Sequence, residues 1–322
     1  MTDAPRIALV SCMKDEGPFL LEWLAYHAGL GFDAMVVATN HCTDGSDALL
    51  AGLAARGLVH HIDHDPGDRP PQDAGMDHVL AWARGAGITH LLHIDSDEFL
   101  WLEDGLPALM ARTSGADVVP IPWRLFGDGG VTAWCPGDLV LERNTRAEPA
   151  PVPGEAKFKC LFRAASFARA TDHNPLEPTV PDPQVMTPDG AALSNASLYQ
   201  AKSARFRPHD VAAGAQTARL HHYAVRSEDV FLMKNARGDG QGKRGDSKYR
   251  LGSHWHRTAN RNDVAAPEMR AHLPRVRALL ETWRADPQVR ALEEACFAAF
   301  AARRAAVLTP DARRAWTKGA PA

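Results

Sequence analysis

A chain of 322 residues, 45% of them hydrophobic and 23% charged, can form one large α/β domain or two smaller ones without disulfide support. Its 36 basic and 39 acidic side chains give a formal net charge of -3, which argues against a nucleic-acid partner. The five cysteines are widely spaced with no C-x-x-C pair, which indicates reduced thiols and a cytoplasmic protein. No segment approaches the roughly 20 apolar residues of a transmembrane helix, so any membrane contact is expected to be peripheral.

Apolar strands alternate with amphipathic helices along the N-terminal part of the chain. The predicted order is strand 7–10, helix 18–31, strand 34–39, helix 46–56, strand 59–62, helix 73–84 and strand 90–94. Pro18 opens the first helix and Gly31 ends it, as these residue types commonly do. This alternation predicts an α/β fold with a mostly parallel sheet and helices on both faces. In such sheets, ligands bind beyond the carboxyl ends of the strands.

The pattern becomes less regular after Pro122. Short strand-like pieces are expected at 139–141 and 158–162, between segments rich in proline and glycine. The proline-dense stretch 175–188 is predicted to be a long surface loop. Loops of this kind often carry substrate contacts.

A helical region is predicted for the C-terminal part of the chain. One helix begins at Ser227 and is followed by a polar break over residues 237–246. Two helices rich in alanine, arginine and leucine are then expected at 267–284 and 287–306. The last dozen residues are predicted to be frayed.

An acidic cluster, Asp95-Ser96-Asp97-Glu98, follows the fourth predicted strand. Asp95 and Asp97 share one face of an extended chain, because side chains alternate with a period of two. Two carboxylates this close repel each other unless a cation lies between them. A hard divalent cation would bind both and keep positions open for phosphate oxygens. The alternative is that these acidic residues only cap a helix or lie in a solvated loop.

Three successive motifs resemble those of a known family. They are Lys14-Asp15-Glu16-Gly17-Pro18-Phe19-Leu20-Leu21-Glu22-Trp23-Leu24-Ala25-Tyr26-His27, Asn40-His41-Cys42-Thr43-Asp44-Gly45-Ser46 and Asp95-Ser96-Asp97-Glu98-Phe99. Together they resemble family 2-type glycosyltransferases with the GT-A fold, and more narrowly a bacterial branch whose first helix reads E-x-x-x-L-x-E-W-x-x-Y-H. The resemblance is strong over residues 6–125 and patchier to about residue 235.

The resemblance implies an inverting hexosyltransferase of polysaccharide or glycoconjugate synthesis. Its donor would be a nucleotide diphosphate sugar, with a UDP-sugar expected first, and its acceptor a saccharide or glycoconjugate hydroxyl. Mn²⁺ or Mg²⁺ would be held at the D-x-D motif. Residues 1–125 would form the nucleotide-sugar-binding half, residues 126–225 the acceptor side, and residues 226–322 a lid loop and the C-terminal helices.

The donor is expected to contact the loops that follow the first two strands. Lys14 and Glu16 precede a helix whose N-terminal amides can face a phosphate or a nucleobase, although the same turn can be only a helix start. The resemblance assigns Asn40 and Asp44 to the base and ribose, and both residue types are also turn formers. Thr39-Asn40 stands where many relatives carry paired aspartates, which leaves the nucleotide open.

Metal ligation is predicted for Asp95 and Asp97, and Asp95 is also expected to contact the donor. By resemblance, His222 is the third ligand. Adjacent histidines on a strand face opposite ways, so only one of His221 and His222 is expected to reach the metal.

The helix that begins near Ser227 carries two basic residues on one face. Lys234 and Arg237 lie three positions apart and could meet the donor diphosphate, or could belong to a solvated basic surface. The loop 237–248 combines glycines with basic residues and is predicted to close over the donor.

The catalytic base is the least determined residue, because no acidic pair stands in the acceptor region. Inverting transfer requires a carboxylate near the acceptor hydroxyl, and the candidates are Asp172 and Asp128. Trp123, Phe126 and Trp134 could stack on a sugar ring or belong to the core. The alternative functions are a nucleotidyltransferase and a catalytically inactive nucleotide-sugar-binding module.

Overall fold

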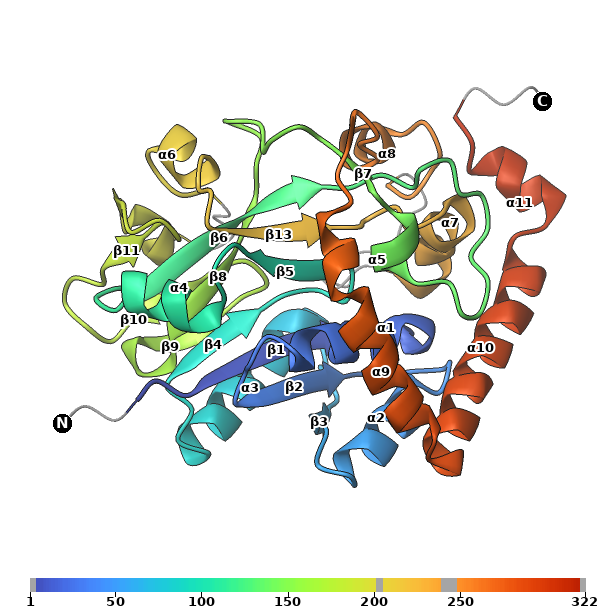
Figure 1. Cartoon of the computed structure of the whole chain (residues 1–322), viewed down its shortest axis with the longest axis horizontal. Coiled ribbons are helices and arrows are strands. Elements are labelled where there is room, and N and C mark those ends of the chain that lie inside the picture. Colours follow the sequence, from blue (N-terminus) through green and yellow to red (C-terminus); the bar gives the residue numbers. More distant parts are fainter. Residues whose placement is uncertain (1–3, 201–204, 239–247, 319–322) are drawn as a thin grey trace.

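The computed structural model describes residues 4–200, 205–238 and 248–318, which are arranged as a central sheet with helices packed around it (Figure 1). Most of the predicted lid loop 237–248 lies outside the described residues. The described part confirms an α/β fold with a helical C-terminal region.

The main sheet of the described chain has 10 strands, eight of which follow the path β12-β11-β6-β8-β4-β1-β2-β3. The N-terminal strands pair in parallel and are β1 (Ile7–Met13), β2 (Ala34–Thr39), β3 (His60–Asp63) and β4 (His90–His93). β8 (Phe158–Arg163) lies antiparallel between β4 and β6 (Val118–Leu125). β13 (Ala218–His222) pairs in parallel with β6 and antiparallel with β5 (Glu98–Leu102). The sheet is therefore mixed, and its parallel half comes from the N-terminal residues.

Side chains of β1 alternate between two hydrophobic cores, as the two-residue period of a strand requires. Ile7 and Leu9 belong to one core, and Ala8 and Val10 belong to the other. The first core is covered by α1 (Gly17–Ala28), α2 (Ser46–Ala54), α9 (Leu273–Arg284) and α10 (Pro287–Val307). The second core is covered by α3 (Pro71–Gly85). Helices on both faces therefore bury the parallel strands, as the sequence predicts.

Two prolines inside β6 coincide with a division of the sheet. The amide of Trp123 donates to the carbonyl of Lys157, just before β8, whereas the amide of Val118 donates to the carbonyl of Gln184, just before β11. Backbone amides of alternate residues point to the same edge of a strand. The backbone nitrogens of Pro120 and Pro122 therefore face the same edge as that of Val118. Along that edge, β11 pairs at Val118 and β13 pairs only from Trp123 onward. The prolines therefore occupy the stretch between these two partners, where no ladder hydrogen bond is lost.

Three expectations for the middle and end of the chain are wrong. Residues 139–141 form no strand; instead, α5 (Val140–Arg143) is a single helical turn. The stretch 175–188 contains two strands, β10 (Pro175–Pro178) and β11 (Val185–Met186), rather than being wholly loop. The last dozen residues include α11 (Pro310–Ala315). Proline is compatible with β10 because this strand has its single partner, β9, on one side.

The remaining described elements are short. The helices are α4 (Leu106–Arg112), α6 (His209–Ala213), α7 (Glu228–Arg237) and α8 (His254–Ala259). The strands are β7 (Arg146–Ala147), β9 (Phe167–Ala170), β12 (Ala192–Leu193) and β14 (Val264–Ala265). None of the described helices is both long and apolar enough to cross a membrane.

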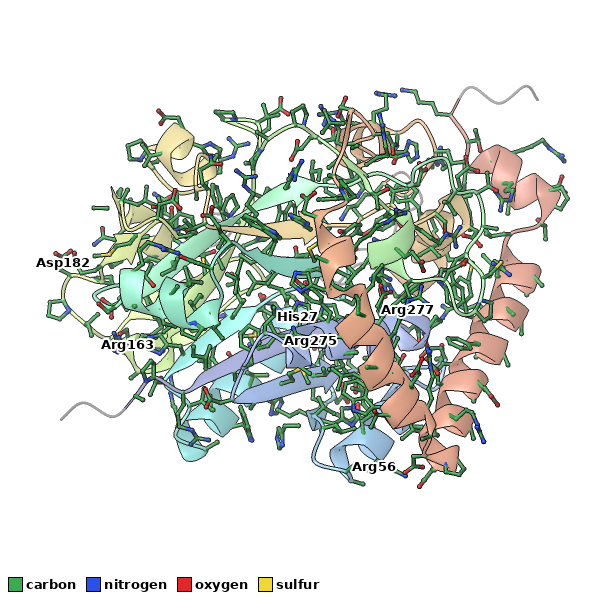
Figure 2. The ribbon with its side chains drawn as sticks, viewed as in Figure 1. His27, Arg56, Arg163, Asp182, Arg275 and Arg277 are labelled. Carbon is green, nitrogen blue, oxygen red and sulfur yellow. The ribbon has the colours of Figure 1, made fainter. Side chains whose placement is uncertain are left out.

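The C-terminal helices are attached to the N-terminal half of the chain. α9 packs against α1, and α10 packs against both α1 and α2. Arg56, just beyond α2, lies beside the turn between α9 and α10 (Figure 2), where its Nε donates to Asp286 at 2.7 Å. The sheet likewise joins distant regions, since β8 comes from residues 126–225 and is inserted between strands of residues 1–125.

Candidate active site

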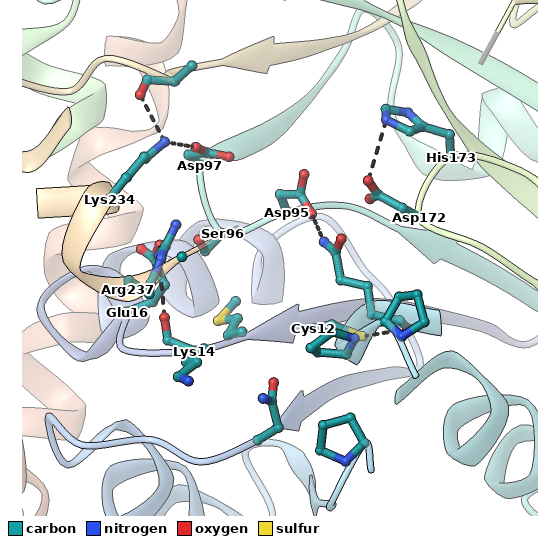
Figure 3. Close-up of a pocket in the computed structure, with 18 of the residues that line it drawn as sticks. Cys12, Lys14, Glu16, Asp95, Ser96, Asp97, Asp172, His173, Lys234 and Arg237 are labelled. Carbon is teal, nitrogen blue, oxygen red and sulfur yellow. Dashed lines mark hydrogen bonds and ion pairs between the residues drawn. The ribbon is translucent and has the colours of Figure 1, made fainter. Parts of the chain in front are cut away.

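A cavity of about 590 Å³ opens at the edge of the sheet where the parallel strands end (Figure 3). Met13, Asn40 and Asp95 line it at or just after the carboxyl ends of β1, β2 and β4. Trp123 and His222 line it near the carboxyl ends of β6 and β13. The cavity therefore lies where ligands bind in open α/β sheets.

Most of the predicted site residues meet in this cavity. Those that line it are Lys14, Glu16, Asn40, Asp95, Asp97, Asp172, His222, Lys234 and Arg237. Asp44 and Asp128 do not line it. These two residues have other contacts in the structure.

Asp44 joins the starts of two helices beside the cavity. Its carboxylate accepts hydrogen bonds of 2.9 Å from the backbone amides of Gly17 and Ser46, the first residues of α1 and α2. Burial raises its pKa against the effect of these bonds. The sequence allows Asp44 either to cap a helix or to contact the ribose. The observed geometry fits the capping role.

Asp128 lies in the turn after β6. Its carboxylate accepts hydrogen bonds of 2.9 Å from the side-chain amide of Asn260 and the backbone amide of Gly130. Asn260 directly follows α8, the helix that carries Trp255. Asp128 therefore helps to fix a helix that contributes a side chain to the cavity wall.

Asp97 is surrounded by basic groups. Lys234 Nζ lies 2.7 Å from Oδ2 of Asp97, and His222 Nε2 lies 3.5 Å from Oδ1. Lys234 also donates to the carbonyl of Ala224 at 2.9 Å. Burial alone would raise the pKa of Asp97, but Lys234 and His222 outweigh it and hold that pKa well below its usual range. Asp97 is therefore ionised at neutral pH.

A buried lysine joins Asp95 to Asp172. Lys159 on β8 is fully buried; its Nζ lies 3.0 Å from Asp95 Oδ2 and also contacts the Asp172 carboxylate. Gln72 donates to the other oxygen of Asp95 at 2.9 Å. Burial raises the pKa of Asp95 to about 6 despite the opposing effect of Lys159. Burial alone would raise the pKa of Asp172, but the nearby Lys159 and His173 outweigh burial and lower this pKa.

Two groups of side chains at or beside the cavity could hold a divalent cation. Oxygen and nitrogen atoms of His93, Asp95 and Asp172 lie within 4.8 Å of one another. However, the Lys159 ammonium already neutralises both of these carboxylates. Asp97 and His222 bring a carboxylate oxygen and an imidazole nitrogen together at 3.5 Å on the cavity wall.

The pair Asp97 and His222 could also hold a divalent cation. Burial lowers the pKa of His222, so the ring is neutral at neutral pH and offers a lone pair. Carboxylate oxygen and imidazole nitrogen are both ligands of Mn²⁺-type ions, which keep other positions for water and phosphate. Lys234 is the group that such an ion would have to displace from Asp97.

The neighbouring histidine belongs to the opposite side of β13. His221 lies against the rings of Trp101 and Phe126, with centroids 6.2 and 4.5 Å away, and it does not line the cavity. His222 instead lies 4.2 Å from the ring of Trp123 on the cavity wall. The two histidines therefore face opposite ways, as expected for adjacent residues of a strand.

Glu16 is held by two arginines beside the cavity. Arg226 Nη1 lies 2.9 Å from its carboxylate, and Arg237 contacts the same group. Arg226 is buried and also donates to the carbonyl of Ser96 at 2.6 Å. It therefore ties the turn after β1 to the turn that carries Asp95 and Asp97.

Several basic residues of the site were not identified from the sequence, and three of them contact the residues discussed above. These three are Lys157, Lys159 and Arg226. A sequence signal did exist for Lys159, because it is the single charged residue in the apolar run Phe158–Phe162 and a buried charge requires a partner. Lys157 and Arg226 lie outside any apolar run, and the sequence gives no sign of what they contact.

Comparison with known proteins gives partial structural matches. No protein-family model matches the chain, and no curated protein matches its sequence. The crystal structure of S. aureus TarS 1-349 is 15% identical over 50% of this chain and 47% of that one, with a TM-score of 0.34. Glucosyl-3-phosphoglycerate synthase from Mycobacterium tuberculosis, solved with Mn²⁺, UDP and glucosyl-3-phosphoglycerate, is 14% identical over 36% and 43%, with a TM-score of 0.26.

A protein of another class matches over a similar share of the chain. The structure of 4-diphosphocytidyl-2C-methyl-D-erythritol synthase is 14% identical over 51% of this chain and 77% of that one, with a TM-score of 0.31. The match to TarS spans about half the length of that structure. Because these matches cover only part of each chain, they do not separate the two enzyme classes.

Proposed function

We propose that this protein is a glycosyltransferase of the GT-A type that moves a sugar from a nucleotide diphosphate sugar to an acceptor hydroxyl, with inversion at the anomeric carbon. One observation carries the proposal. The ionised carboxylate of Asp97, paired with His222 and Lys234, lies in the same cavity as the loops that follow β1 and β2. This arrangement suits a nucleotide at the strand ends and a diphosphate near Asp97.

The nucleoside would lie over the ends of β1 and β2, where Lys14 and Asn40 line the cavity. The diphosphate would then extend toward Lys234 and Arg237 on α7. Both of these cations contact carboxylates in the present structure, Asp97 and Glu16 respectively. A diphosphate that enters can take over part of these contacts, because phosphate oxygens accept strong charge-assisted hydrogen bonds.

A divalent cation, when bound by Asp97 and His222, would neutralise the charge that develops on the leaving nucleotide diphosphate. Lys234 and Arg237 would supply further positive charge on the same side. Asp95, held by Lys159 and Gln72, would orient the sugar or its phosphate. Burial of these groups strengthens each electrostatic contact because little water competes with it.

Asp172 is our choice for the base that accepts the proton of the acceptor hydroxyl. It lines the cavity, is ionised at neutral pH, and is fixed by Lys159 and by His173, whose Nε2 lies 3.5 Å from its Oδ2. A general base must be ionised and held within reach of the proton that it removes. Asp128, which does not line the cavity, is less well placed for this step.

The test combines a donor screen with one substitution. Sugar release from a panel of UDP-, GDP- and TDP-sugars is measured with and without Mn²⁺, together with nucleotide binding. We expect one nucleotide class to bind and its sugar to be released. Asp97→Asn should lower kcat/KM on the order of a hundredfold, because it removes charge from the centre of the site.

Asp104→Asn is the matched control, because Asp104 is exposed and pairs with Arg112 on the surface. It should leave turnover and nucleotide binding as they are. Full activity of Asp97→Asn would overturn the proposal. So would pyrophosphate release from a nucleoside triphosphate and a sugar phosphate, which would identify a nucleotidyltransferase.

A further inference from the structure

One wall of the cavity contains a lysine held over aromatic rings. Lys157, just before β8, has its Nζ 5.6 Å from the ring centroid of Trp123 and 5.4 Å from that of Trp255. All three residues line the cavity. The two rings come from β6 and α8, so three separate parts of the chain form this wall.

Lys157 differs from the basic residues near Asp97. Lys234 contacts the Asp97 carboxylate and Arg237 contacts Glu16. Among the described residues, no carboxylate forms an ion pair with Lys157, whose observed contacts are the two indole rings. Within the described part of the chain, its ammonium therefore has hydrogen-bond donors that a ligand could use.

The surroundings of Lys157 are positively charged. Lys248 also lies over Trp255, 5.7 Å from its ring centroid. Partial burial lowers the pKa of Lys157, and Lys248, Lys159 and Arg205 add to this effect, while Asp172 opposes it. The Asp172 carboxylate is already engaged by Lys159 and His173. An anion bound at this wall would reduce the repulsion between Lys157 and Lys248.

We propose that this wall is the acceptor subsite and that it recognises an anionic saccharide, one that carries a carboxylate or a phosphate. The inference rests on the proposed function, because it assumes that the donor occupies the loops after β1 and β2. The sugar ring would stack on Trp123 or Trp255, and its anionic group would meet Lys157. A hydroxyl of the same ring would then lie near Asp172, because His173 contacts both Trp123 and Asp172.

The chemistry of the wall favours a charged sugar over a neutral one. Aromatic rings bind the apolar face of any pyranose, so they do not discriminate by charge. An ammonium that has no counter-ion among the described residues can form charge-assisted hydrogen bonds with an anionic ligand, which are worth about 1.5 to 3 kcal/mol each. We therefore expect roughly tenfold or tighter binding of an anionic sugar than of its neutral counterpart.

The test uses the full chain saturated with UDP and Mn²⁺, so that the donor loops are occupied. Binding of glucuronic acid, glucose 6-phosphate and glucose is followed by saturation-transfer NMR. We expect at least one of the two anionic sugars to bind roughly tenfold more tightly than glucose. The sugar that binds distinguishes a carboxylate from a phosphate as the recognised group.

Three variants make the result specific to Lys157. Lys157→Met should remove the preference for the anionic sugar, whereas Lys157→Arg should keep most of it. Lys318→Met, near the end of the described chain, changes the net charge equally and should leave the preference unchanged. Weaker UDP binding in Lys157→Met would assign the lysine to the donor and overturn the inference.

The inference and the proposed function can fail separately. If UDP binds but glucose binds as tightly as both anionic sugars, the anionic acceptor is wrong and the donor assignment stands. If UDP and the other nucleotides do not bind the folded protein, the proposed function is wrong, and the acceptor assignment falls with it.

Discussion

Glu22 belongs to the first of the three sequence motifs, yet it does not line the cavity. Its carboxylate is buried and accepts hydrogen bonds from the backbone amides of Val140 and Leu141, at 2.9 and 3.0 Å. These amides begin α5, so the side chain acts as a remote cap for that helical turn. Burial raises the pKa of Glu22 to about 7 despite these bonds.

This raised pKa predicts how Glu22 contributes to stability as pH changes. Below its ordinary value of 4.5 the group is protonated in both the folded and the unfolded chain. As pH rises toward about 7, the unfolded chain releases the proton first, so the free energy of unfolding falls. Relative to Glu22→Gln, the natural protein should lose up to about 3 kcal/mol across this range.

The measurement is urea unfolding of the natural protein and of Glu22→Gln at several pH values from about 4.5 to 8. The difference between their free energies of unfolding should change with pH and then level off above about pH 7. Histidines with lowered pKa affect both proteins equally and cancel in this difference. If the free energies of unfolding of the two proteins changed in parallel over the whole pH range, Glu22 would not titrate within that range.

At the scale of single residues, local spacing was enough to place Asp95 and Asp97 in one cavity, and their roles stay predictions. Asp95 and Asp97 lie at positions i and i+2 after an apolar strand, and that local pattern alone points to a paired acidic site. Their partners Lys159 and Lys234 are far away in the chain, and their contacts depend on how β8 and α7 are placed. Tertiary structure also decides that Asp95 meets a lysine, which the local pattern cannot show.

The first helix, α1, holds the strand that follows the acidic turn. The hydroxyl of Tyr26 donates to the carbonyl of Leu100 at 2.6 Å, and the indole of Trp23 donates to the carbonyl of Glu98 at 2.9 Å. His27, near the middle of the molecule in Figure 2, accepts at Nε2 from the amide of Leu100 at 3.3 Å. The motif W-x-x-Y-H therefore fixes β5, and through β5 the position of Asp97.

This role predicts a stability cost when the tyrosine hydroxyl is removed. Tyr26→Phe keeps the ring but leaves a buried carbonyl without one donor, which should lower the free energy of unfolding by about 1 kcal/mol. The cost should appear in urea denaturation as a lower midpoint with an unchanged slope.

Tyr199→Phe is the matched control, because Tyr199 is 59% exposed. It should leave the midpoint unchanged. Equal midpoints for the two variants would show that the hydroxyl of Tyr26 adds no stability and that packing of α1 alone holds β5.

Elements were predictable where their own residues set the period. The βα units of the first hundred residues bury a regular stripe or an alternating face, so both their type and their order were predicted. Residues 139–141 are too short a run to distinguish a strand from a helical turn, and the amides of α5 are stabilised by Glu22, a distant residue. β10 and β11 have few residues, so their strand pattern is weak and the proline content dominated the prediction.

Contacts between distant regions hold the whole molecule together. Arg304 on α10 donates to Asp229 Oδ2 at 2.6 Å and to the carbonyl of Trp134 at 2.7 Å. Asp229 is fully buried in the first turn of α7 and also accepts from the amide of Trp134. One cluster therefore links α10, α7 and the loop after β6. The three predicted regions 1–125, 126–225 and 226–322 are thus connected through the sheet and through these side chains.

This connectivity predicts that damage in α10 destabilises the entire chain. Arg304→Met leaves the Asp229 carboxylate buried without its cation. A fully buried pair would cost about 3 to 5 kcal/mol to break. The side chain of Arg304 is 29% exposed, so water compensates in part, and we expect a cost of roughly 2 kcal/mol.

Unfolding of Arg304→Met should remain a single transition, because α10 is packed on α1 and α2, and β8 is inserted between strands of the N-terminal half. Tryptophan fluorescence and far-UV circular dichroism should report the same lowered midpoint in urea. Arg277→Met is the control: Arg277, labelled on α9 in Figure 2, forms an exposed pair with Glu142, and such pairs are worth at most about 1 kcal/mol. A separate early transition confined to part of the signal would show that the C-terminal helices unfold on their own despite these contacts.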